Sequence, residues 1–422
     1  MILDCLKYIA RKDEMKKTIL KSYAELIVKA GIGLKKGQPV IVNAPVEQEE
    51  LVAMIVDECY KNGAKTVYVD WSSQKISRIA LKRGGKNELA KMLPMEIAQQ
   101  EYMTNELPCM IYILSEDPDG LKGVNPAKMA YIRKEKMKVI APYREKREDK
   151  YQWCIAGAAS PAWAKKVFPN LSKKAATEKL WETILEVSRA ADGNGIANWE
   201  AHDANLRKMY GKLNDLRLKS LHYTSSNGTD LTVGLIPGVK WLGGGETLAD
   251  GSFFQPNIPS EEIFTTPMKG QAEGIVYSAK PLAYQGNIIR DFWVKFENGK
   301  AVDVHAEEGE ELLRSILEID EGSAYLGECA LVPFDSPINN TGILFYETLY
   351  DENAACHLAL GRGFASLYPG YENMTKDELL EKGINWSSSH VDFMIGSKDL
   401  NIVGTTEDGR EIQIFKDGNW AF

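Results

Sequence analysis

The chain has 422 residues, of which 44% are hydrophobic and 26% are charged, an ordinary balance for a folded globular protein. Its 59 acidic and 51 basic side chains give a net charge of -8. This excess of negative charge argues against general binding to nucleic acid or to an anionic membrane, which needs a basic face, although a small basic patch remains compatible with it.

The N-terminus predicts a protein of the cytoplasm. Residues 1–7 lack the basic start, long apolar run and small-residue cleavage site of a signal peptide. No apolar stretch approaches the roughly 18–20 residues of a membrane-spanning helix. The six cysteines, Cys5 among them, are scattered without a CxxC pair, which is typical of reduced, buried thiols rather than of a disulfide framework. We therefore expect a soluble cytoplasmic protein.

Helix and strand signals alternate through the first half of the chain. Residues 17–32 have helical periodicity, and a β-branched run at 39–42 precedes a predicted helix over 47–62. Three further apolar runs are predicted strands: 66–69, 109–114 and 138–141. Short apolar strands separated by helices indicate a largely parallel sheet with helices on both faces. We therefore predict an α/β N-terminal domain over residues 1–216.

The glycine-rich stretch Gly31–Gly37 superficially matches a dinucleotide-binding loop. Its spacing is wrong, and it precedes a strand, whereas the fingerprint requires a strand–turn–helix setting. A helix cap and turn is the favoured interpretation, and no nucleotide cofactor is expected.

From about residue 217 the β signals dominate. Residues 223–233 are typical of two strands joined by an Asn-Gly turn. Four further strands are predicted at 274–278, 289–296, 329–332 and 411–415, with one helix at 310–319. We therefore predict a second, β-rich α+β domain over residues 217–422.

Two of the five histidines lie near carboxylates. In an extended segment, His390 and Asp392 would project from the same face. Asp351 is a good helix N-cap, which would place Glu352 in the first turn of a helix and His357 about one and a half turns later. Imidazole beside carboxylate suits zinc, cobalt or manganese, and a plain His–Asp hydrogen bond is the alternative. Solvated or structural roles are expected for His202, His222 and His305.

Two glutamates stand in unusual surroundings. Glu262 lies in a stretch with prolines near both ends, and Glu328 opens an apolar strand. Burying an unpaired carboxylate is costly, so each should have a strong partner, either a metal cation or an arginine or lysine. The neighbouring Cys329 should face away from Glu328 in a strand, which favours a packed core thiol over a metal ligand.

These segments together resemble the thermophilic aminopeptidase family, peptidase family M29. The matching stretches are Asn257–Pro267, Gly327–Cys329, Asp351–Gly361 and His390–Ser397, in this order. The resemblance covers essentially the whole chain. It implies an N-terminal α/β domain, a C-terminal catalytic domain and a homodimer. It also implies an exopeptidase site with two divalent metal ions (zinc, cobalt, manganese or magnesium) that acts on peptides with a free N-terminus.

Carried onto this chain, the resemblance implies five metal ligands: Glu262, Glu328, His357, His390 and Asp392. Of the two adjacent glutamates, Glu262 rather than Glu261 matches the motif. We expect Glu328 or Asp392 to bridge the ions. Glu352 matches another acidic position near the site, either a further ligand or the base, and we take it as the candidate general base.

One position departs from the family pattern. Members of the family carry a tyrosine seven residues after the position of His357, and this chain has Phe364 there. A phenyl ring can neither ligate a metal nor donate a hydrogen bond, although Tyr368 would be placed to substitute in a helical segment. The predicted function is therefore a metal-dependent aminopeptidase. The alternatives are a family member that binds metal or peptide without efficient turnover, and a nonenzymatic binding or scaffold protein.

Overall fold

The computed structural model describes residues 17–284 and 286–422, which form two compact units. The first unit comprises the described residues up to Ala201 together with Gly245–Pro259, and the second comprises His202–Gly244 and Ser260–Phe422. The features predicted for residues 1–7, including Cys5, lie outside the described residues. No helix in the described part of the chain is both long and apolar enough to cross a membrane.

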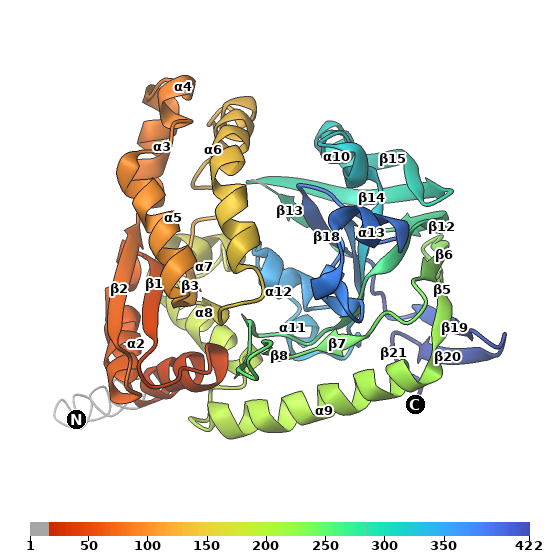
Figure 1. Ribbon diagram of the computed structural model, residues 1–422, viewed down its shortest axis with the longest axis horizontal. Helices are drawn as coiled ribbons and strands as arrows, with labels where there is room; N and C mark the ends of the chain where they lie inside the picture. The colour runs from red at the N-terminus through yellow and green to blue at the C-terminus, as the bar shows by residue number, and fades with distance from the viewer. Residues whose placement is uncertain (1–16, 285) are drawn as a thin grey trace. The chain divides into compact units, whose positions relative to one another are not determined.

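A five-stranded parallel sheet forms the centre of the first unit (Figure 1). Its strands lie in the order β10-β4-β3-β1-β2, and each neighbouring pair is parallel. Their bounds are Pro39–Pro45 for β1, Thr66–Ser72 for β2, Cys109–Leu114 for β3, Trp153–Gly157 for β4 and Asn257–Ile258 for β10. The predicted parallel sheet is confirmed. The inner strands β1 and β3 are mostly buried, whereas the edge strand β2 is largely exposed.

Helices connect these strands. Residues 17–26 are helical and continue into the π-helical turn η1, Ile27–Gly31, which confirms a helix end and turn before β1. Several later helices begin at a serine or asparagine whose side chain accepts a backbone N–H, as an N-cap should. The bounds are η2 Val46–Gln48, α2 Glu49–Lys61, α3 Gln74–Arg83, α4 Lys86–Leu89, α5 Pro94–Glu106, α6 Pro126–Arg147, α7 Pro161–Val167, α8 Lys173–Val187 and α9 Gly195–Leu216.

The strand predicted at residues 138–141 is wrong. These residues lie inside the helix α6, which begins after Asn125, whose side chain accepts the N–H of Lys128 at 3.1 Å. A four-residue apolar run does not distinguish a strand from one turn of a helix, and here the capped helix continues through it. The sheet instead takes in β4, which the sequence reasoning missed.

Antiparallel sheets dominate the second unit. A nine-stranded sheet runs in the order β13-β14-β12-β6-β5-β19-β20-β21, with β15 paired to β14. The predicted Asn-Gly hairpin is confirmed as the antiparallel pair β5–β6. The bounds are β5 Leu218–Thr224, β6 Asp230–Leu235, β12 Pro267–Tyr277, β13 Leu282–Tyr284, β14 Asn287–Glu297, β15 Lys300–Glu308, β19 Asn401–Thr406, β20 Glu411–Lys416 and β21 Asn419–Trp420.

A second, five-stranded sheet runs in the order β18-β17-β16-β11-β7, and all of its pairs are antiparallel. Its bounds are β7 Leu242–Gly243, β11 Ile263–Thr265, β16 Leu326–Leu331, β17 His357–Gly361 and β18 His390–Met394. The strands β16 and β17 are buried throughout. This sheet carries four of the predicted ligands, Glu328, His357, His390 and Asp392.

One large apolar cluster of the second unit holds the two main sheets together. Phe292 of β14 packs on Phe393 of β18, with 5.9 Å between ring centroids. Cys329 belongs to the same cluster and is fully buried, which confirms the prediction of a core thiol. All five cysteines of the described residues are buried and free. The short helices of this unit are α10 Glu310–Leu317, η3 Glu321–Ala324, α11 Pro337–Asn340, α12 Thr348–Glu352, η4 Ala365–Leu367, η5 Tyr371–Asn373 and α13 Lys376–Glu381.

Candidate metal centre

Strand pairing brings the predicted ligands to one region of the five-stranded sheet. Glu328 of β16 pairs with Ala359 of β17, which in turn pairs with Asp392 of β18. His390 begins β18, and Glu262 directly precedes β11, the other neighbour of β16. Side chains from four segments that are distant in sequence therefore lie within a few ångströms of one another.

The predicted helical setting of His357 is wrong. His357 is the first residue of β17, and the helix before it, α12, already ends at Glu352. Asp351 lies inside α12 and does not cap a later helix. Its carboxylate instead accepts the N–H groups of Phe345 at 2.7 Å and Glu347 at 3.2 Å, so it is committed to the preceding loop. The apolar run that follows His357 is then free to form a buried strand.

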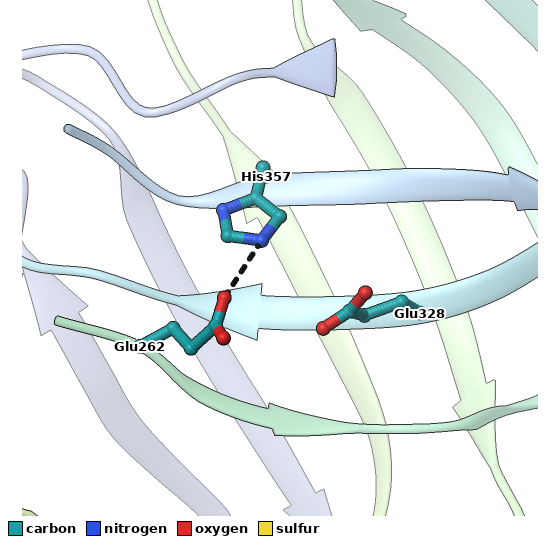
Figure 2. Close-up of side chains that lie close together, drawn as sticks. All are labelled: Glu262, Glu328 and His357. Atoms are coloured by element: carbon teal, nitrogen blue, oxygen red, sulfur yellow. Dashed lines mark ion pairs between the residues drawn. The ribbon is translucent and has the colours of Figure 1, made fainter. Parts of the chain in front are cut away.

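Three side chains form the first group of potential metal donors (Figure 2). Donor atoms of Glu262, Glu328 and His357 all lie within 4.8 Å of one another. The Nε2 atom of His357 is 3.3 Å from Oε2 of Glu262. Its Nδ1 lies 3.1 Å from the carbonyl oxygen of Ala355, which can only accept, so Nδ1 is the donor. That bond directs Nε2 toward the carboxylates, the usual arrangement of a metal-binding histidine.

The second group shares Glu328 with the first. It consists of Glu328, His390 and Asp392, again with donor atoms within 4.8 Å of one another. The Nε2 atom of His390 lies 3.0 Å from Oε2 of Glu328 and 3.1 Å from Oδ1 of Asp392. Its Nδ1 donates to the carbonyl oxygen of Arg362 at 2.8 Å. His390 and Asp392 thus project from one face of β18, as their spacing predicted.

The electrostatics of this cluster call for a cation. Burial raises the pKa of Glu352 well above its ordinary value, and the charges of Asp392 and Glu262 add to the shift. Burial also raises the pKa of Glu328, although the hydrogen bond from His390 opposes it. Within the described residues, no lysine or arginine forms an ion pair with any of these four carboxylates. Among the residues that the structure describes, His357 and His390 are the only side chains that pair with this cluster as cations, and a bound metal would supply the further positive charge that four carboxylates need.

Comparison with known proteins agrees with this geometry. The chain matches the family of thermophilic metalloproteases (M29) over residues 16–420. The aminopeptidase AmpS of Bacillus subtilis (strain 168) is 43% identical over 404 residues, which cover 96% of this chain and 98% of the relative. Aminopeptidase T of Thermus aquaticus is 36% identical, over 95% of this chain and 98% of its own.

A solved structure is similar along its whole length. The wild-type AmpT structure from Thermus thermophilus has a TM-score of 0.88 and 36% sequence identity, and the match covers 96% of this chain and 99% of that one. This chain belongs to the M29 metalloprotease family. Membership in a metalloprotease family implies a divalent metal, and the two donor groups of this M29 protein are suited to hold one.

The M29 protein has a phenyl ring beside its donor cluster. The centroid of the Phe364 ring lies 5.2 Å from that of His390 and 5.2 Å from that of Phe264. Tyr368 does not take its place. It follows the short turn η4 and packs on a separate apolar cluster with Ile236 and Leu379.

The other three histidines of the M29 protein are outside the donor groups, as expected. His222 pairs with Asp230 at 2.7 Å and His305 pairs with Glu310 at 2.7 Å, and both rings are exposed. His202 is buried and its Nε2 contacts the carbonyl oxygen of Ser260 at 2.8 Å. The sequence reasoning missed the backbone carbonyls of Ala355 and Arg362 that orient the two donor histidines, because a backbone group carries no side-chain signal.

Proposed function

We propose that this M29 protein is a metal-dependent aminopeptidase that releases N-terminal residues from peptides by means of two divalent ions. The observation that carries the proposal is the pair of donor groups that share Glu328. Its relatives AmpS and aminopeptidase T, at 43% and 36% identity, are aminopeptidases, which supports the same activity.

The two donor groups suggest how two ions would be held. Glu262, Glu328 and His357 would bind one ion, and Glu328, His390 and Asp392 would bind the other. Glu328 is common to both groups, so its carboxylate would help to hold both ions. Mixed imidazole and carboxylate donors suit zinc, cobalt and manganese, and magnesium less well because it prefers oxygen donors.

In the proposed mechanism, bound ions supply Lewis-acid chemistry, which acidifies water and polarises the scissile carbonyl. Glu352, the last residue of α12, is outside the two donor groups but near enough to Asp392 and Glu262 for their charges to add to the rise in pKa that burial causes, and we assign it the role of general base. It accepts a proton from the attacking water and returns it to the leaving amine. Carboxylates of the cluster that remain unneutralised would attract the α-ammonium group of the substrate, which would restrict cleavage to the first residue.

The proposal is tested with metal-free protein reloaded in turn with zinc, cobalt, manganese and magnesium. A panel of aminoacyl-p-nitroanilides is the substrate, and the N-acetylated form of each is the control. We expect metal-restored cleavage of the free-amine substrates and no cleavage of the acetylated ones. Cleavage that survives thorough removal of metal, or equal cleavage of the acetylated substrates, would refute the proposed function.

A catalytically impaired family member is the second candidate. The phenyl ring of Phe364 lies beside His390, where the resemblance places a tyrosine, and it offers no hydrogen bond to a developing oxyanion. The same experiment separates the two candidates. Metal uptake near two ions per chain with no cleavage of any free-amine substrate favours the impaired form.

We further propose that the chain forms a homodimer and acts in the cytoplasm. The dimer rests on the family resemblance, and the compartment rests on the scattered cysteines, which include no CxxC pair. Light scattering coupled to size-exclusion chromatography should give twice the 47.1 kDa chain mass for the purified protein.

A further inference from the structure

A buried amide joins the two chain segments that carry Glu262 and Glu352. Asn353 follows α12 and is 0% exposed. Its Oδ1 accepts the N–H of Glu261 at 2.7 Å, across 92 positions of sequence. Its Nδ2 donates to the carbonyl oxygen of Leu349 at 2.9 Å and lies 3.5 Å from Oε1 of Glu352. One side chain therefore touches the backbone before one predicted ligand and the carboxylate of the predicted base.

The hydrogen-bond partners of the Asn353 amide determine which of its two terminal atoms is the oxygen and which is the nitrogen. The N–H of Glu261 can only donate, and the carbonyl of Leu349 can only accept. The oxygen of Asn353 must therefore face Glu261, while its NH2 group faces Leu349 and Glu352. This NH2 group is the one hydrogen-bond donor in contact with the Glu352 carboxylate within residues 17–284 and 286–422.

We propose that Asn353 is a positioning residue of the catalytic centre. It orients the Glu352 carboxylate for proton transfer and also fixes the backbone directly before Glu262. The role in proton transfer rests on the function proposed above. The contact of 3.5 Å is at the outer limit of a hydrogen bond, and catalytic contacts of this kind shorten when substrate is bound.

Two substitutions separate the two tasks. Asn353→Asp keeps an oxygen that accepts the Glu261 N–H but removes the donor to Glu352 and to the Leu349 carbonyl, and it adds negative charge beside Glu352. We expect its affinity for cobalt to stay within about threefold and its KM within about twofold, while kcat falls about 10–100-fold. Asn353→Ala also releases the Glu261 N–H. It should additionally weaken cobalt binding about 10–100-fold and change the d–d absorption spectrum, because Glu262 loses its support.

Asn214 offers a matched control. Its side-chain amide also makes two hydrogen bonds to the backbone of one residue. It accepts the N–H of Trp241 at 2.9 Å and donates to the Trp241 carbonyl oxygen at 3.0 Å. It is not among the donor groups of the metal centre. Asn214→Asp should therefore lower thermal stability without changing cobalt affinity, the cobalt spectrum or kcat at a temperature where the variant is folded.

The outcomes decide between a positioning role and a structural one. Wild-type kcat in folded Asn353→Asp, or a fall in kcat that only tracks loss of metal or a lower melting temperature, overturns the proposal.

If wild-type protein takes up metal but cleaves no substrate, the proposed function fails. The cobalt affinity and spectrum then decide the positioning role alone, and unchanged values in Asn353→Ala overturn it. If the alanine variant does not fold, Asn353→Ser replaces it in the two cobalt measurements, because its shorter side chain also releases the Glu261 N–H, and an unchanged spectrum and affinity overturn the proposal.

Discussion

Protons and metal ions compete for the same nitrogen atoms of the donor histidines. Burial lowers the pKa of His357, but the hydrogen bond and charge of Glu262 outweigh burial and raise that pKa to about 9. The pKa of His390 is also raised, because Asp392 and Glu328 outweigh the effect of burial. In the metal-free protein at pH 7, each ring therefore carries a proton on Nε2, the atom that a metal needs.

Metal binding should consequently release protons. With the pKa of His357 near 9, the apparent affinity should rise with pH, about tenfold per unit for each proton displaced, and level off above pH 9. Calorimetric titration with manganese at pH 7, in buffers of different ionisation enthalpy, gives the number of protons released. We expect between one and two per chain. A binding heat that does not depend on the buffer would contradict this protonation state.

The ring of Phe364 provides a second residue-level prediction. It contacts the His390 ring, so a hydroxyl added at its edge would lie near the donor cluster. Phe364→Tyr should raise kcat about tenfold or more, because one oxyanion donor contributes about 100–1000-fold in other hydrolases. The measurement is kcat at equal metal content. Phe264→Tyr, which makes the same change on the neighbouring ring, is the control and should leave kcat unaltered. An unchanged or lower kcat in Phe364→Tyr would show that the missing hydroxyl at position 364 does not limit catalysis.

At the scale of elements, the start of β18 is held by a carboxylate from outside its sheet. Asp320 accepts the hydroxyl of Ser387 at 2.8 Å and the N–H of Ser388 at 2.7 Å, three and two residues before His390. It also accepts the N–H groups of Gly322 and Ser323 at the start of η3. One ionised side chain therefore ties η3 to the segment that delivers His390.

Asp320→Asn should destabilise the protein in a pH-dependent way. Burial alone would raise the pKa of Asp320, but hydrogen bonds from Ser388 and Ser387 outweigh it and lower the pKa. A lowered pKa in the folded state stabilises above the unfolded value of about 3.9, and this stabilisation is lost as the pH falls through the folded pKa. We expect a loss of about 1–3 kcal/mol in the free energy of unfolding at pH 7, shrinking below pH 4.

Urea unfolding of both proteins across this pH range measures the difference. Glu321→Gln is the control, because it removes one negative charge from the exposed neighbouring residue and should cost little at any pH. A difference between wild type and Asp320→Asn that stays constant from pH 7 to pH 3.5 would mean that the charge of Asp320 contributes nothing.

At the scale of the whole molecule, local sequence patterns predicted individual helices and strands better than they predicted which distant segments pair. The alternation of helices and strands was enough for the parallel sheet of the first unit, and the two-residue period placed His390 beside Asp392. Nothing local indicated that residues 245–259 belong to the first unit or that β10 extends its sheet. The helix predicted around His357 failed because the carboxylate of Asp351 bonds to the loop before it. The choice of Glu262 over Glu261 and the role of Glu352 came from the family resemblance, since local sequence does not say what an isolated glutamate does.

Metal bound by the donor cluster should also stabilise the second unit. The unfolded chain cannot present the site, so ions that bind only the folded state stabilise it, by about 2.7 kcal/mol at a concentration of 100 times Kd. For a unit of this size, chelation should then lower the melting temperature by roughly 5–10 °C. Hydrogen exchange should quicken in β16, β17 and β18 and stay unchanged in β1 and β3. Glu328→Gln, which removes the shared donor, should melt at the same temperature with and without chelator. A wild-type melting temperature that does not change with chelator would mean that metal does not contribute to the fold, and the protonated rings of His357 and His390 would then be enough to balance the carboxylates.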